Sequence, residues 1–446
     1  MRKSRLSVGG WPAKSRRMVS FRTCAALFFG ILVCTRPALA VIVGGDYASL
    51  SDTNVNTSPS PTDDPGFYSV GRVGAASGVY LGNNWVITAA HVTIGNVVFK
   101  FWDPGSAQYV TATYQKSSTS GVILTNPSGP GANNNTDLIM FQIDPTTSPY
   151  GSPNLPQPLI APSAPSAAAG NFQGDRVVAV GNGIDRQDSY TYWDNSLPTW
   201  QTTTAGSASH TGYLVNGTQQ LRWGENLVSQ SGIPVNVGTT NNPKYVQSFV
   251  TTFDQFQPNS GGTALPSEFQ VTNGDSGGGV FLNVNGLWML SGVIDTIGLL
   301  NGQPYPLPAT PNLPLTAAFG DTSYMADLSF YRSQILALDP LVGDANGDGF
   351  VNGLDISVIS AHWLMPGPTG DVNGDGVVNG LDVSVIAAHW SGLPFNPFGG
   401  GGSGTGGLGV PEPSAGLLAA AASALLLLGC GRKRFRRGAH ILSARR

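Results

Sequence analysis

The strongest constraint on the fold lies toward the carboxyl end, where a short acidic segment occurs twice. Residues 343–363 read GDANGDGFVNGLDISVISAHW, and residues 370–390 read GDVNGDGVVNGLDVSVIAAHW. Asp344 of the first copy corresponds to Asp371 of the second, 27 residues further on. A repeat this close indicates one supersecondary unit that is used twice.

Each copy carries oxygen-bearing side chains at positions 1, 3, 5, 9 and 12 of a loop, with glycine at position 6. This is the spacing of an EF-hand calcium loop. Carboxylates so close together repel one another without a cation, so we expect two Ca²⁺ ions to drive the folding of this segment. The predicted ligands are Asp344, Asn346, Asp348, the carbonyl of Phe350, Asn352 and Asp355 in the first loop, and Asp371, Asn373, Asp375, the carbonyl of Val377, Asn379 and Asp382 in the second.

The apolar pattern after each loop fits a short amphipathic helix. Two such loop–helix repeats with Asp at position 12 resemble a dockerin, a module that docks onto cohesins. The resemblance implies a small α-helical calcium-binding domain at residues 341–394 and a cohesin-type docking partner. Gly353-Leu354 and Gly380-Leu381 stand where many dockerins carry hydroxyl residues. Either the partner differs, therefore, or the pair of repeats only stabilises the chain.

Composition predicts a loop-rich β protein for residues 41–340. The 446 residues include 59 Gly and 32 Pro, and 11% are charged, against about 25% in ordinary globular chains. The net charge of −3 argues against nucleic acid as a partner. Turn residues separate short apolar runs, which predicts an antiparallel barrel or sandwich. These runs are 78–89, 97–102, 138–143, 176–180, 278–282 and 287–294, and a helical pattern first occurs at 323–338.

Three motifs in this region point to nucleophilic catalysis. An apolar run from Trp85 ends at His91, Asp137 opens another apolar run, and Ser276 lies in Gly274-Asp275-Ser276-Gly277-Gly278. A serine hydroxyl needs an imidazole base, and the imidazole needs a carboxylate to orient it. Glycines beside the serine allow backbone N–H groups to turn toward an oxyanion. The other histidine of the region, His210, lies in a polar loop, so we predict His91 as the base.

A serine between such glycines also occurs in α/β-hydrolases, but there the acid and the histidine follow the serine. The order His91, Asp137, Ser276 and the motif Thr88-Ala89-Ala90-His91 resemble the trypsin/chymotrypsin family of serine endopeptidases. The resemblance implies two antiparallel six-stranded β-barrels with the site in the cleft, and a helix near 323–338. It assigns Ser276 as nucleophile, His91 as base and then acid, Asp137 as orienting acid, and the N–H groups of Gly274 and Ser276 as oxyanion hole. No cofactor for catalysis is implied.

The same resemblance bears on activation and specificity. Ile42 begins an Ile-Val-Gly-Gly sequence, which in this family forms a buried N-terminus that pairs with the Asp before the serine, here Asp275. Removal of a signal would leave Val41 first, so trimming to Ile42 is a predicted activation step; an ordinary first strand is the alternative. Gln270 takes the place at the base of the primary pocket, which does not support cleavage after Arg or Lys. Asp295 is a further candidate for the substrate cleft.

Both ends read as targeting segments. In residues 1–40 an apolar run, Cys24–Cys34, precedes Ala38-Leu39-Ala40, which fits a signal peptidase site. A Gly-rich linker at 395–410 leads to Pro-Glu-Pro, an apolar helix and an Arg cluster at 411–437, with a cytoplasmic tail at 438–446. Residues 411–437 resemble the PEP-CTERM sorting signals of bacterial envelope proteins, which an exosortase removes after export; a permanent transmembrane anchor is the alternative. With Cys430, the three cysteines of the chain all lie in these ends, so residues 41–340 hold no disulfide and no thiol nucleophile.

These observations predict an exported serine endopeptidase of the cell envelope or the extracellular space. It would hydrolyse peptide bonds of a protein or peptide through an acyl-enzyme, and it would carry the dockerin-like pair at its carboxyl end. Two alternatives stay open. One is a non-catalytic binding or scaffold protein built on a protease fold, and the other is an esterase that uses the same triad.

Overall fold

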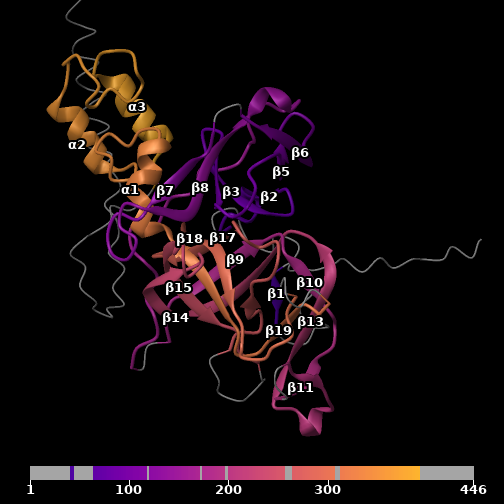
Figure 1. The fold of residues 1–446 in the computed structure, drawn as a ribbon. Helices are drawn as coiled ribbons and strands as arrows, with labels where there is room; N and C mark the ends of the chain where they lie inside the picture. Colours follow the sequence, from indigo (N-terminus) through magenta and orange to yellow (C-terminus); the bar gives the residue numbers. More distant parts are fainter. Residues whose placement is uncertain are drawn as a thin grey trace, which may run out of the picture. The chain divides into compact units, whose positions relative to one another are not determined.

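The structure is a computed structural model, and it describes residues 41–44, 64–117, 120–170, 173–195, 199–256, 264–306 and 312–391. Within these residues the chain forms mainly antiparallel strands, and its three α-helices lie between residues 328 and 388. Figure 1 shows the strands and helices along the chain. The predicted signal segment, Gly-rich linker and sorting segment lie outside the described residues. No helix of the described part is long and apolar enough to cross a membrane.

The first barrel is built from residues 70–144. Its sheet runs in the order β4-β3-β2-β5-β6-β8-β7, and a further pairing of β4 with β8 closes six of these strands into a ring. Buried aromatic side chains such as Phe99, Tyr114 and Phe141 form much of its core. The strands are β2 (Val70–Val73), β3 (Ala76–Gly82), β4 (Trp85–Ala89), β5 (Val97–Asp103), β6 (Gln108–Lys116), β7 (Val122–Thr125) and β8 (Asn135–Asp144).

The second barrel is closed, in the order β14-β15-β20-β18-β17-β9. Neighbouring strands in it are antiparallel. The predicted pair of antiparallel six-stranded barrels is thus confirmed. The strands are β9 (Arg176–Gly181), β14 (Arg222–Asn236), β15 (Tyr245–Thr252), β17 (Gly279–Val284), β18 (Leu287–Gly298) and β20 (Thr322–Asp327).

Shorter elements complete the described chain. A five-stranded sheet contains β10 (Ile184–Arg186), β11 (Thr191–Asp194), β12 (Gln201–Thr202), β13 (His210–Gln219) and β19 (Thr316–Ala318). A two-stranded sheet pairs β1 (Ile42–Val43) with β16 (Phe269–Gln270). Single 3₁₀ turns lie at Phe67–Ser69, Pro145–Thr147 and Ala205–Ser207, and the helices are α1 (Leu328–Leu338), α2 (Gly353–Ala361) and α3 (Gly380–Ala388).

Two predicted elements are divided in the structure. The run 78–89 forms two strands, β3 and β4, because the chain turns at Asn83 and Asn84, whose φ angles are 44° and 65°. Asparagine tolerates this left-handed conformation better than most residues. The helical pattern at 323–338 begins as strand β20, and α1 starts only at Leu328. The Asp327 carboxylate accepts the Ser329 N–H at 3.0 Å and caps the helix there.

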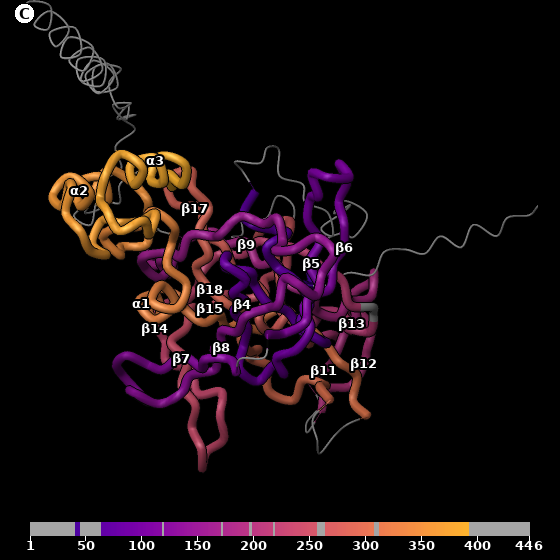
Figure 2. The backbone as a smooth tube through the Cα atoms, turned by 90° about the horizontal axis from the view of Figure 1, so that it is seen from above, coloured from indigo at the N-terminus to yellow at the C-terminus, as the bar shows by residue number. Residues whose placement is uncertain are grey.

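Helix α1 contacts β7 of the first sheet and β18 of the second barrel, and Figures 1 and 2 both show it beside these strands. The buried Tyr331 hydroxyl of α1 donates to Asn126 Oδ1 at 2.8 Å. It accepts the Gln247 N–H at 2.9 Å and lies 3.2 Å from Thr136 Oγ1. One phenol thus links the helix to segments of both barrels.

We predict that Tyr331→Phe lowers the free energy of unfolding by about 1–3 kcal/mol, because it keeps the ring packing but leaves buried polar groups unpaired. Urea unfolding of the purified variant measures this loss. Tyr109→Phe is the matched control, since Tyr109 is 52% exposed and its variant should stay within about 0.5 kcal/mol of the wild type. A Tyr331→Phe variant as stable as this control would contradict the prediction.

Candidate active site

The pairing of β4 with β8 brings His91 and Asp137 together. Ala89 lies opposite Leu138 in this pair, and the next N–H, that of Ala90, donates to the Asp137 carbonyl oxygen at 2.8 Å. The imidazole therefore lies beside the carboxylate, with 2.5 Å between His91 Nδ1 and Asp137 Oδ2. When the carboxylate accepts the Nδ1 proton, Nε2 is left as a proton acceptor.

The surroundings of this pair keep the carboxyl ionised. The side chain of Asp137 is 3% exposed, whereas that of His91 is 47% exposed. Burial on its own would raise the pKa of Asp137, but the hydrogen bond and charge of His91, together with Asp295 and Lys244, hold that pKa below its usual value. Lys244 Nζ lies 3.2 Å from the second oxygen, Asp137 Oδ1. The His91 imidazole and the Lys244 ammonium therefore both contact the ionised Asp137 carboxylate.

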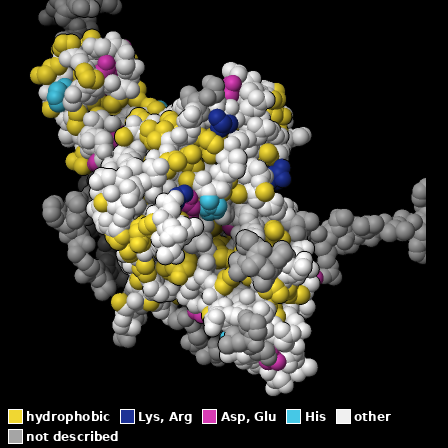
Figure 3. All heavy atoms as spheres, in the orientation of Figure 1, with side chains coloured by type: hydrophobic (Ala, Val, Ile, Leu, Met, Phe, Trp, Pro, Cys, Tyr) yellow, Lys and Arg dark blue, Asp and Glu magenta, His cyan; other side chains and the backbone are white. Residues whose placement is uncertain are grey.

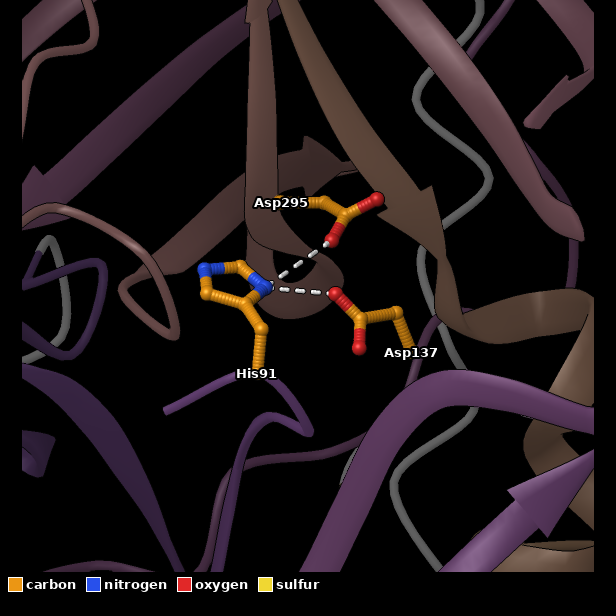
Figure 4. A group of neighbouring side chains, drawn as sticks. All are labelled: His91, Asp137 and Asp295. Carbon is orange, nitrogen blue, oxygen red and sulfur yellow. Dashed lines mark hydrogen bonds and ion pairs between the residues drawn. The ribbon is translucent and has the colours of Figure 1, made fainter. Parts of the chain in front are cut away.

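A second carboxyl group faces the same imidazole. Asp295 Oδ1, from β18, lies 4.0 Å from His91 Nδ1, and the Asp295 side chain is fully buried. Figure 4 shows both carboxyl groups on one edge of the ring and the second ring nitrogen pointing away from them. Burial first, and then the charge of Asp137, raise the pKa of Asp295 well above its usual value.

These three side chains offer ligand atoms within 4.8 Å of one another, which raises the question of a metal site. The Lys244 ammonium already supplies a positive charge at Asp137. A divalent cation at the cluster would be repelled by that ammonium. We therefore interpret the cluster as a site that holds and moves protons.

Ser276 lies on a tight turn held against the first barrel. Ser77 donates its N–H to the Ser276 carbonyl and its Oγ–H to the Gly274 carbonyl, each at 2.9 Å. Gly277 has a φ of +86°, and a Cβ there would lie 2.1 Å from the Ser77 oxygen, so only glycine fits. Within the part of the chain that is described, the N–H groups of Gly274 and Ser276 donate to no other protein group. Both can therefore bind an oxyanion.

The three predicted catalytic side chains line one cavity of about 470 Å³, together with Lys244 and Asp295. Figure 3 shows a histidine near the middle of this face, with acidic and basic atoms beside it. No hydrogen bond joins Ser276 to His91 among the described residues. Such contacts often tighten only when a substrate binds.

Comparison with protein families agrees with this geometry. The Trypsin family matches residues 59–230, and the Dockerin type I domain family matches residues 342–389. The chain combines a trypsin domain with a dockerin type I domain. The trypsin match includes His91 and Asp137 but ends before Ser276, so the role of Ser276 depends on the cavity described above.

Solved structures with some similarity include the inactive form of the Rv3671c protease, at 14% identity and a TM-score of 0.32, covering 68% of this chain and 99% of that one. Another is neuropsin, a serine protease expressed in the limbic system of mouse brain, at 15% identity and a TM-score of 0.32, covering 67% of this chain and 99% of that one. At these values they add nothing to the family matches. The curated proteins contain no match.

Gln270, predicted at the base of the specificity pocket, is buried inside the trypsin domain and is 1% exposed. Its Oε1 accepts the Ser323 hydroxyl at 3.0 Å, and its Nε2 donates to the Thr322 carbonyl at 3.3 Å. Gln270 is not among the described residues that line the cavity. Its amide is therefore engaged within the fold.

Val41, the residue before β1, lies against Asp275 in the uncut chain. The Val41 backbone N–H donates to the Asp275 carboxylate, and Val41 is fully buried. Ile42 instead pairs with strand β16. Asp275 also accepts the Gly183 N–H at 2.7 Å. In the uncut chain the contact with Asp275 is therefore made one residue before Ile42.

Burial raises the pKa of Asp275 to about 7 in this chain, which is continuous through Val41. Cleavage of the bond before Val41 would turn the nitrogen that already contacts Asp275 into an ammonium group. An ammonium at this position would stabilise the buried carboxylate, because an opposite charge favours the ionised form.

We predict that the stability advantage of a chain cut before Val41, over an uncut chain, grows as pH rises from about 4 to about 7. In the uncut chain the folded state holds the Asp275 proton more tightly than the unfolded chain, whose carboxyl has an ordinary pKa of about 4. That contribution to stability is therefore lost as pH rises toward the folded pKa of about 7. In the cut chain the Val41 ammonium stabilises the ionised form of Asp275, so this loss of stability with rising pH does not occur.

Thermal unfolding of the two forms across this pH range tests the prediction. Asp275→Asn is the control, since both of its forms should show the same pH dependence. Parallel melting profiles for the cut and uncut chains with Asp275 intact would contradict the prediction.

The first loop of the dockerin domain fits a divalent cation. Burial, and then the charges of Asp355 and Asp348, raise the pKa of Asp344, and Asp355 is fully buried. A cation between these carboxylates would relieve their repulsion, and hard oxygen ligands suit Ca²⁺. Asn352 and Asn379, predicted at position 9 of each loop, accept N–H groups of the helix that follows and cap it.

The two loops differ in their surroundings at position 7. Phe350 is 3% exposed and packs with Leu159 and Met289 of the trypsin domain. The Arg332 guanidinium of α1 lies 5.2 Å from the centre of its ring. Val377, at the same position of the second loop, is 43% exposed. The first loop is therefore part of a core that it shares with the barrel.

Proposed function

We propose that this chain is an exported serine endopeptidase that acts through His91, Asp137 and Ser276. The observation that carries the proposal is the cavity lined by these three side chains, in which a buried carboxylate accepts the Nδ1 proton of His91. A serine, an imidazole with a free Nε2 and an orienting acid are the groups that acyl transfer needs.

The reaction begins when Ser276 Oγ attacks the carbonyl carbon of a peptide bond and His91 Nε2 takes the hydroxyl proton. The negative charge that forms on the carbonyl oxygen is stabilised by the N–H groups of Gly274 and Ser276. Asp137 keeps the imidazole in one tautomer and stabilises its cationic form. His91 then passes the proton to the leaving amine, which departs and leaves an acyl group on Ser276.

Water completes the cycle. His91 Nε2 removes a proton from a water molecule, which attacks the acyl carbon, and the same proton returns to Ser276 Oγ as the carboxylic acid product leaves. No metal or organic cofactor takes part in these steps as proposed.

We predict that Ser276→Ala lowers kcat by about 10⁴- to 10⁶-fold on a peptide substrate, because the nucleophile is lost while binding remains. Hydrolysis of a peptide library by wild type and variant measures the effect, and matched circular dichroism spectra establish that the variant is folded. Ser329→Ala, a change remote from the cavity, serves as the control. Unchanged hydrolysis by Ser276→Ala would rule out the proposal.

The two alternatives differ from it in measurable ways. A non-catalytic scaffold would fail to react with a serine-directed fluorophosphonate, whereas the endopeptidase should be labelled in a manner that Ser276→Ala abolishes. An esterase would be labelled too, but it would hydrolyse esters and leave peptides intact. Parallel assays on matched peptide and ester substrates separate these activities.

The dockerin domain carries the second part of the proposal. Dockerin type I domains bind calcium in general, and we propose one Ca²⁺ ion in each loop of this chain and a cohesin-type partner. Leu354 and Leu381 occupy equivalent places at the starts of α2 and α3 and are 50% and 59% exposed. A partner that docks there would offer an apolar surface in return.

We predict that Asp348→Ala and Asp375→Ala each reduce the bound calcium from two ions to one, because each removes a carboxylate from one loop. The two residues hold position 5 of their respective loops, so each variant controls for the other. Calorimetric titration of the full chain counts the ions, and the double variant should bind none. Two ions retained by either single variant would contradict the assignment.

Export and processing form the third part. The proposed route is cleavage by signal peptidase after Ala40 and removal of the tail by an exosortase. Cleavage after Ala40 would create the Val41 ammonium that fits Asp275, so no separate trimming to Ile42 is needed. Sequencing the amino end of secreted, active protein tests this: Val41 is expected first, and an active form beginning at any other residue would refute the route.

A further inference from the structure

Asp295 is a buried carboxyl group that no hydrogen-bond donor of the described chain contacts. Both of its oxygens are buried, and within the described chain no N–H or O–H group donates to either of them. The Asp137 carboxyl group lies close by: Asp137 Oδ2 and Asp295 Oδ1 lie 2.5 Å and 4.0 Å from the same nitrogen, His91 Nδ1, and the ligand atoms of the three side chains lie within 4.8 Å of one another. Two buried ionised carboxylates this close would repel each other, so we expect one of the two to carry a proton.

The neighbours of the pair indicate which one carries it. Asp137 has two donors, His91 Nδ1 at 2.5 Å and Lys244 Nζ at 3.2 Å. His91 Nδ1 lies 4.0 Å from Asp295 Oδ1, beyond hydrogen-bond range. The Tyr331 hydroxyl, which is close enough to feel the charge of Asp295, donates to Asn126 instead.

The charge of Lys244 compensates an ionised Asp295 only in part. It lowers the pKa of Asp295, but burial and the charge of Asp137 outweigh it and raise that pKa. An ionised Asp295 would therefore be a buried charge beside the charge of Asp137, which is strongly unfavourable. Asp137, with an N–H donor on each oxygen, is the member of the pair that stays ionised.

We propose that Asp295 is a neutral carboxylic acid that donates a hydrogen bond to Asp137 and thereby acts as a positioning residue for the His91–Asp137 pair. Asp137 then has three donors from three segments: His91 after β4, Lys244 before β15 and Asp295 in β18. Lys244 and Asp295 both come from the second barrel, whereas His91 and Asp137 come from the first. The hydrogen bond from Asp295 therefore helps to hold Asp137, and through it His91 of the first barrel, in place relative to Ser276 of the second barrel.

The protonation state can be measured without reference to activity. Infrared difference spectra of wild type minus Asp295→Asn at pH 7 should contain the C=O stretch of a protonated carboxylic acid, lost in the variant. Glu268→Gln is the matched control, because burial raises the pKa of Glu268 to about 8 and its loss should remove a different band. A difference spectrum in which Asp295→Asn removes a carboxylate band instead would overturn the proposal.

The positioning role rests on the proposed function and is tested by kinetics. Asp295→Leu removes the donor and should lower kcat by about 10- to 100-fold, with KM changed by less than about threefold. Asp295→Asn keeps an N–H donor in the same place and should rescue most of this loss. Equal losses in the two variants, at equal melting temperatures, would overturn the role.

The pH profile of kcat/KM separates a neutral from an ionised Asp295. If the carboxyl is neutral, the acid limb of the profile should coincide for wild type and Asp295→Asn. If it were an anion 4.0 Å from His91, its removal would shift that limb down by about one pH unit, which would overturn the proposal. A wild type that shows the protonated-acid band but cleaves no peptide would refute the proposed function and support the proton assignment.

Discussion

The hydrogen bond from His91 Nδ1 to Asp137 depends on how the first barrel closes. The ring of strands is completed by the β4–β8 pair, and the register of that pair sets the acid beside the base. A shift of one residue in this register would turn Asp137 to the opposite face of its strand. The closure that stabilises the barrel therefore also builds the His91–Asp137 pair.

The second barrel then acts on this pair from the other side. It supplies the Ser276 turn, the Lys244 ammonium and the Asp295 carboxyl group. Ser77 of the first barrel holds the Ser276 turn by two hydrogen bonds, and Tyr331 ties α1 to both barrels. These contacts between the barrels are rigid polar links, and they take over part of the role that disulfides play in other small β proteins.

Sequence alone predicted the parts whose signals are local. Short apolar runs between turn residues predicted an antiparallel barrel or sandwich, and the resemblance to the trypsin/chymotrypsin family supplied the two barrels. His91 and Ser276 were visible because each lies in a distinctive motif. Lys244 was missed, since it is 107 residues from Asp137 and occupies a turn with no pattern of its own. Asp295 was predicted only to face the substrate cleft. Its position beside Asp137 depends on how the strands pair, which the sequence does not reveal. The contact of the Val41 N–H with Asp275 was not predicted either, because the pairing of β1 with β16 sets where that N–H lies.

The unequal packing of the two predicted calcium loops has a consequence for the stability of the whole chain. Phe350 contributes to a core shared with the barrel, so an ion that orders the first loop also strengthens the catalytic body through thermodynamic linkage. At the same position the second loop carries Val377, whose side chain is 43% exposed. The two near-duplicate repeats thus differ in their surroundings: calcium bound in the first loop would also strengthen the barrel that Phe350 packs against, whereas position 7 of the second loop faces solvent.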